Sequence, residues 1–125
     1  MNAFEILTDE SLCEHFITLN TSRDQYLNYL ANCDSDDIHG VQQYKDTYEQ
    51  SRALYSVKRN ETLTQFVEYC IDNINHEHIV DIINNLDSLA EFNKTIYQTN
   101  IGDKKYLHYH KLYTSASSIL CLRFL

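Results

Sequence analysis

The sequence predicts an all-α protein, a compact bundle of four to five helices that forms one domain over residues 1–125. Two observations support this prediction. The 125 residues contain no proline and only two glycines, Gly40 and Gly102, and these residue types interrupt helices and form turns. Apolar residues also recur at three- and four-residue spacing along most of the chain, which is the period of an amphipathic helix.

The first helix is expected to begin at Thr8-Asp9-Glu10, or at the capping-box pattern from Ser11 to Glu14, and to end near Asn32. Its apolar positions follow helical spacing, and they are Leu12, Phe16, Leu19, Tyr26 and Leu30. The polar run over residues 34–40 then predicts a loop.

The middle of the chain predicts either one long helix or two. Apolar residues continue from Val41 to Ile74. Lys58-Arg59-Asn60 is typical of a helix C-terminus, whereas Thr62-x-x-Gln65 has the form of a new capping box. Asn73-Ile74-Asn75 supplies turn-forming residues that end the segment.

Two further helices complete the predicted bundle. The strongest periodicity predicts the central core helix, and its apolar stripe comprises Ile79, Ile82, Ile83, Leu86, Leu89, Ala90, Phe92 and Ile96. A loop is expected over residues 99–103, and helical spacing resumes from Tyr106 to Leu120. Residues 115–125 end in an almost continuous apolar run. Such a run is compatible with a helix and with an extended or short-strand tail, so the sequence predicts both alternatives for this segment.

Negative charge is concentrated in the first part of the chain. Residues 1–40 hold eight acidic side chains and one basic side chain, within a formal net charge of −8. Such a field attracts basic partners and repels nucleic acid and anionic membranes. We therefore expect a basic protein partner, with no direct nucleic-acid binding and no membrane association.

The chain is expected to be cytoplasmic. Met1–Leu7 lacks the basic segment that begins a signal peptide, and no apolar run approaches the roughly 20 residues of a membrane span. The four cysteines are Cys13, Cys33, Cys70 and Cys121, each among apolar neighbours or close to them, and are interpreted as reduced thiols.

The sequence contains no motif that specifies a catalytic reaction, so we expect no enzyme activity and no cofactor. The sequence contains two histidine pairs, His76-Glu77-His78 and His108-Tyr109-His110, and neutral imidazole is a common zinc ligand. On a helix, residues i and i+2 point about 200° apart, so such a pair converges only in an extended segment or a turn. No metal site is therefore expected.

These features predict a small acidic binding protein that neutralises a basic macromolecular partner, such as a nuclease, by protein–protein contact. In size, charge and lack of a catalytic motif it resembles inhibitors and toxin-immunity or antitoxin-like proteins, although no residue motif supports that comparison. The candidate partner-binding residues combine steering acids with tyrosines, which are frequent at binding hot spots. They are Glu10, Glu14, Asp24, Tyr26, Tyr29, Asp34, Asp36, Asp37, Tyr44 and Tyr48.

An alternative function is a non-catalytic adaptor, a chaperone or a homo-oligomeric structural subunit, with a homodimer as its simplest form. In this alternative the apolar residues 119–125 form the interface.

Overall fold

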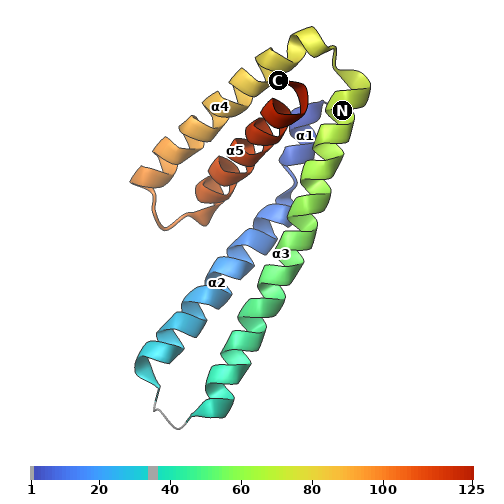
Figure 1. The fold of residues 1–125 in the computed structure, drawn as a ribbon. Helices are drawn as coiled ribbons and strands as arrows, with labels where there is room; N and C mark the ends of the chain where they lie inside the picture. The colour runs from blue at the N-terminus through green and yellow to red at the C-terminus, as the bar shows by residue number, and fades with distance from the viewer. Residues whose placement is uncertain (1, 34–36) are drawn as a thin grey trace.

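In the computed structural model, which describes residues 2–33 and 37–125, the chain is a bundle of helices (Figure 1). In chain order the helices are α1 (Ala3–Leu7), α2 (Glu10–Asn32), α3 (Ile38–Asn73), α4 (His76–Thr99) and α5 (Lys104–Phe124). The described residues contain no strand, so the all-α prediction is confirmed. No helix in this described part combines the length and the apolar character that crossing a bilayer requires.

Aspartates are the N-caps of α2, α3 and α5. The Asp9 carboxylate accepts a hydrogen bond from the Ser11 backbone N–H at 2.9 Å, and Asp37 accepts one from the Gly40 backbone N–H at 3.0 Å. Each cap satisfies a free N–H group and places negative charge at the positive end of the helix dipole. The predicted loop over residues 34–40 is therefore too long, because Asp37 caps α3 and residues 38–40 form its first turn.

Helix α3 is one continuous helix of 36 residues, about 54 Å long at 1.5 Å per residue. Of the two alternatives left open for this segment, the structure has the single long helix, and Lys58-Arg59-Asn60 lies within it. Arg59 instead donates a hydrogen bond to the Ser115 hydroxyl on α5, and Thr62 is buried rather than capping a new helix. Arg59 and Thr62, which resemble a helix boundary in the sequence, therefore make contacts with the rest of the fold instead.

The helices form two hairpins that share one core (Figure 1). Helix α2 packs along α3, α4 packs along α5, and the short α1 packs against α3. Helix α5 contacts α2, α3 and α4, whereas the main contact of α4 is with α5. The prediction that residues 79–96 form the central helix is therefore wrong, since α5 has that position.

The core contains buried apolar side chains from all five helices. The largest that are almost fully enclosed are Leu7, Leu12, Phe66, Ile79, Leu86, Leu112 and Leu120. Leu7 lies on α1, a helix that was not predicted from the sequence.

The four cysteines are free thiols, and burial raises the pKa of Cys70 to about 11.

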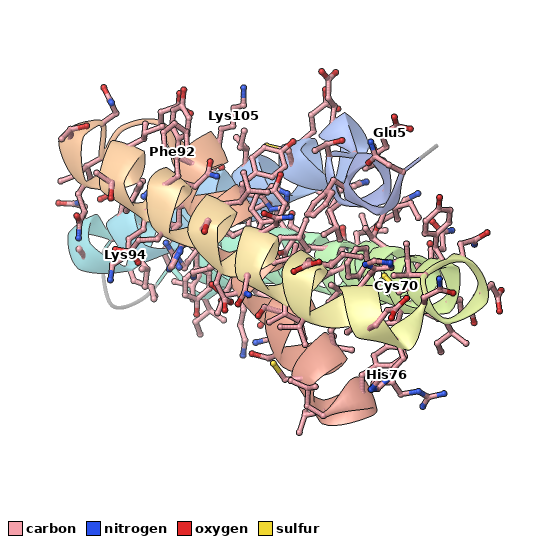
Figure 2. All side chains as sticks on the ribbon, turned by 90° about the horizontal axis from the view of Figure 1, so that it is seen from above. Glu5, Cys70, His76, Phe92, Lys94 and Lys105 are labelled. Carbon is pink, nitrogen blue, oxygen red and sulfur yellow. The ribbon has the colours of Figure 1, made fainter. Side chains whose placement is uncertain are left out.

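The predicted stripe of α4 is correct except at Phe92, which is 63% exposed. The inward position is filled by Asn93, whose amide donates to the Leu89 carbonyl of the preceding turn at 2.8 Å. Figure 2 shows Phe92 and Lys94 on α4 with their side chains directed away from the core. The open question at the C-terminus is also settled, because α5 stays helical to Phe124.

The hairpin of α2 and α3 extends beyond the core as an arm, which we define as residues 24–33 and 37–54 (Figure 1). No side chain in these two ranges is buried. The last buried residue of α2 is Ser22, and the first of α3 is Thr62. Ser22 and Ser51 form a hydrogen bond of 3.1 Å between the helices where the arm begins.

Candidate functional site

The four candidate tyrosines lie on the arm and pack against each other in pairs. The rings of Tyr29 and Tyr44 are stacked with centroids 4.6 Å apart, and those of Tyr26 and Tyr48 are tilted at 6.0 Å. Each pair joins α2 to α3, and aromatic pairs of this geometry stabilise a contact beyond the area they bury. Tyrosine thus takes the place of an aliphatic core in the arm.

Gly40 permits the close approach of one of these rings. A Cβ atom at Gly40 would overlap the Tyr29 hydroxyl group and lie 2.7 Å from Oδ2 of Asp37. The absence of a side chain at this position lets Tyr29 cross to the first turn of α3. Tyr44 is 37% exposed, so part of the tyrosine cluster remains accessible to a partner.

The candidate acids do not form one compact patch. Glu10 and Glu14 lie in the first turns of α2, where they line a hollow of about 470 Å³ with Lys105 of α5. Asp24 is ten residues beyond Glu14 on the same helix, a separation of about 15 Å along the helix axis. The acidic residues of α2 are therefore divided between the core end of the molecule and the arm.

Of the remaining candidate acids, Asp37 is the one that the structure describes. Asp37 is partly buried and is engaged as the N-cap of α3. Asp34 and Asp36 lie outside the described residues, so the structure does not describe their contribution.

The two histidine pairs face different environments. His78 is exposed in the first turns of α4, with its ring nitrogens 3.7 Å from Glu77 and 3.9 Å from Asp81. His108 is fully buried, whereas His110 places Nδ1 2.9 Å from the Ala90 carbonyl oxygen of α4. Within the described ranges, no three His, Cys, Asp or Glu side chains gather in the manner of metal ligands.

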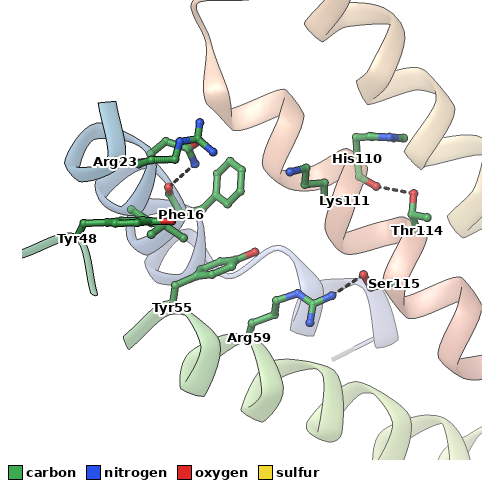
Figure 3. Close-up of a pocket in the computed structure, with 11 residues that line it drawn as sticks. Phe16, Arg23, Tyr48, Tyr55, Arg59, His110, Lys111, Thr114 and Ser115 are labelled. Carbon is green, nitrogen blue, oxygen red and sulfur yellow. Dashed lines mark hydrogen bonds between the residues drawn. The ribbon is translucent and has the colours of Figure 1, made fainter. Parts of the chain in front are cut away.

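A pocket that the sequence analysis missed lies where α2, α3 and α5 meet, at the base of the arm (Figure 3). Its volume is about 440 Å³, which is within the usual range of small-molecule sites. Each of the three helices contributes one cation, namely Arg23, Arg59 and Lys111. Aromatic rings form part of the wall, and these belong to Phe16, Tyr48 and Tyr55.

Hydrogen bonds hold two of these cations in place. Nη2 of Arg23 donates to the Asn20 side-chain oxygen at 3.0 Å, and Nη2 of Arg59 donates to the Ser115 hydroxyl at 2.6 Å. Lys111 places Nζ 5.9 Å from the centroid of the Phe16 ring. Figure 3 shows the Arg59 and Lys111 side chains directed into the space between the helices.

The aromatic wall of the pocket adjoins a buried histidine. The ring of His108 lies 5.2 Å from Phe16 and 4.8 Å from Tyr109, measured between centroids. Both of its nitrogens are enclosed without a hydrogen-bond partner among the described residues. Burial, aided by the charge of Arg59, lowers the pKa of His108 to about 4, so the ring is neutral at pH 7.

Comparison of the chain with protein-family models, with curated proteins and with solved structures gave no match. The candidate sites therefore rest on the geometry of this chain. The pocket was missed because Arg23, Arg59 and Lys111 are far apart in the sequence and belong to three helices. In the sequence Arg23 stands between the apolar positions Leu19 and Tyr26 without any motif around it, and Arg59 belongs to a cluster that is typical of a helix end.

Proposed function

We propose that this chain is a small acidic binding protein that neutralises a basic macromolecular partner by protein–protein contact, as inhibitors and toxin-immunity proteins do. The arm is the proposed contact surface, and the role is cytoplasmic and non-catalytic. The observation that carries the proposal is an extended helical hairpin without a buried side chain of its own. Such a hairpin adds surface for recognition while contributing little to the shared core.

Apolar side chains on the arm support a contact role. Leu27 is 53% exposed, Ile38 is 74% exposed and Leu54 is 58% exposed. Together with the partly accessible tyrosine pairs, they give the mixture of aliphatic and aromatic groups that forms the centre of many protein interfaces.

The charge of the arm supports a basic partner. The arm, residues 24–33 and 37–54, holds four acidic and two basic side chains, and in the sequence Asp34 and Asp36 lie between its two ranges. A negative field of this kind accelerates the encounter with a basic surface, and the acceleration weakens as salt is added. The cleft of a nuclease is such a surface, because it binds a polyanion.

The first experiment is capture from a lysate of the native host, with the purified chain immobilised at low and moderate salt and the captured proteins identified by mass spectrometry. A stoichiometric basic protein that is retained more strongly at low salt supports the proposal. Association rates with that protein are then measured for the triple variant Asp24→Lys, Asp46→Lys, Glu49→Lys.

The matched control is the triple variant Glu61→Lys, Glu68→Lys, Asp72→Lys, which makes the same change in net charge on α3 outside the arm. We expect the arm variant to slow association at least roughly tenfold at low salt, and the control to slow it much less. Equal slowing by both variants would assign the effect to net charge alone. In that case the arm would not be the contact surface.

A second candidate function is a homo-oligomeric or adaptor subunit, and it is favoured by the exposure of the C-terminal turn. Leu122 is 88% exposed and Leu125 is 74% exposed. Light scattering of the purified chain, with the double variant Leu122→Asp, Leu125→Asp for comparison, tests this role. A dimeric parent chain that the double variant converts to a monomer supports this role. A monomeric parent chain excludes the homo-oligomeric subunit.

A further inference from the structure

The pocket at the base of the arm has the charge of an anion-binding site, although the protein as a whole is acidic. The chain has 18 acidic and 10 basic side chains. Three of those bases line this pocket, and no carboxylate lines it among the described residues. The local charge therefore has the opposite sign to the net charge.

Arg23 forms a long, exposed ion pair with its neighbour Asp24. Nε of Arg23 is 3.8 Å from Oδ1 of Asp24, and both side chains are about half exposed. An exposed ion pair of this length contributes little and competes weakly with a ligand. The Arg23 guanidinium is therefore available to an anion that enters the pocket.

Hydroxyl groups lie beside the cations. Ser115 and Thr114 of α5 line the pocket, together with Tyr55 of α3. Burial raises the pKa of the Tyr55 hydroxyl, and the neighbouring Arg59 opposes this rise. The Tyr55 hydroxyl consequently keeps its proton at pH 7 and is a hydrogen-bond donor.

This set of donors suits a phosphoryl group better than a single carboxylate. A phosphate monoester carries a charge of about −1.5 to −2 at pH 7 and has three strong acceptor oxygens. Two guanidinium groups and an ammonium group match this charge and number of acceptors, and arginine is well suited to phosphate because it binds with two parallel N–H groups. A carboxylate has one negative charge and would leave most of these cations uncompensated.

The size and walls of the pocket indicate that the phosphoryl group belongs to a small organic molecule. The volume of about 440 Å³ exceeds what a free phosphate ion needs. Phe16, Tyr48 and Tyr55 provide apolar surface beside the cations, where an organic group can pack.

We propose that the pocket between α2, α3 and α5 binds a small organic phosphate, whose phosphoryl group is held by Arg23, Arg59 and Lys111. The pocket shares Tyr48 with the arm, but binding of the phosphate does not depend on the partner proposed above. Because the three cations come from three helices, the ligand would connect α5 to the base of the arm.

Isothermal titration calorimetry of the purified chain at constant ionic strength tests the proposal. The probes are AMP, ribose 5-phosphate and glycerol 3-phosphate, each compared with the matched compound that lacks phosphate: adenosine, ribose and glycerol. We expect at least one phosphate to bind with a Kd below about 1 mM and its unphosphorylated partner to show no measurable binding. Absence of binding by all three phosphates, or equal binding by the matched pairs, overturns the proposal.

Variants then locate the binding site. Arg23→Gln and Lys111→Gln alter exposed side chains, and each is expected to weaken phosphate binding roughly tenfold through loss of a charge-assisted hydrogen bond. Arg52→Gln and Lys58→Gln remove the same charge from α3 outside the pocket, and they should change the Kd less than about twofold. Equal weakening by the pocket and control variants would indicate general charge attraction and overturn the assignment.

Nuclear magnetic resonance of the amide groups locates the bound phosphate independently of the variants. Amide chemical-shift changes during titration of the parent chain are expected at Phe16, Thr114 and Ser115. Changes confined to other parts of the chain would show that the phosphate binds elsewhere and would refute this site.

Discussion

Replacing His108 by leucine should make the protein less sensitive to acid. His108 is fully buried against Phe16 and Tyr109, and both ring nitrogens lack a hydrogen-bond partner among the described residues. Burial lowers its pKa from 6.5 to about 4. Leucine has a similar volume and no polar atom, so the variant removes the titrating group without opening a large cavity.

The direction of the effect follows from proton binding. Between pH 6.5 and about 4 the unfolded chain protonates His108, whereas the folded chain keeps it neutral. The free energy of unfolding therefore falls as the pH falls through this interval, and the stability contributed by the neutral imidazole is fully present only above pH 6.5. From these pKa values, the loss assigned to His108 between pH 7 and pH 5 is about 2 kcal/mol.

Urea unfolding followed by circular dichroism measures this difference at pH 7 and at pH 5. We expect His108→Leu to lose about 2 kcal/mol less than the parent chain over this interval. At pH 7 it should equal the parent or exceed it by about 1 kcal/mol, because two unpaired buried nitrogens are removed. His39→Gln, which changes an exposed histidine of α3, serves as the control and should resemble the parent.

Parallel losses in the parent and in His108→Leu, within about 0.5 kcal/mol, would refute the reasoning. That result would mean that the imidazole is not held neutral in the folded core.

Three further predictions concern stability and use the same urea assay. Leu86→Ala should cost about 2–5 kcal/mol because the side chain is fully enclosed, whereas Leu122→Ala, at a position 88% exposed, should change stability by less than about 0.5 kcal/mol. Asp37→Ala should cost about 1 kcal/mol, since it removes the N-cap hydrogen bond of α3, and Asp37→Asn should retain most of the stability. Ser117→Ala should cost about 1–3 kcal/mol, because the buried hydroxyl donates to Oδ1 of Asp87 at 2.6 Å, and a change near zero would show that this bond contributes nothing net.

Much of the fold was predictable because helix formation is largely a local property. The apolar spacing of α4 predicted a helix over the correct part of the chain, and the expected helix start at Thr8-Asp9-Glu10 contains Asp9, the N-cap of α2. The exception at Phe92 has a structural reason: Asn93 satisfies its amide within the helix and occupies the buried position instead. Apolar character alone did not distinguish these two neighbours.

Sequence-based interpretation was least informative for side chains that are compatible with a local role, such as ending a helix, but that make a contact with another helix in the fold. Arg59 in a basic cluster is typical of a helix end, yet it bonds to Ser115 on α5 and lies within α3. The tyrosines were correctly placed on helix faces, but their pairing across the arm depends on the register of α2 against α3. Sequence spacing within one helix carries no information about that register.

The sequence by itself determined that the chain is helical and acidic, since helical periodicity and charge are properties of neighbouring residues and of composition. The tertiary structure alone decided that α5 is central, that the arm extends without a buried core, and that three cations from separate helices line one pocket. The physical reason is that these features depend on which helix faces pack together. That choice is made by contacts between residues distant in the chain, and local patterns do not encode it.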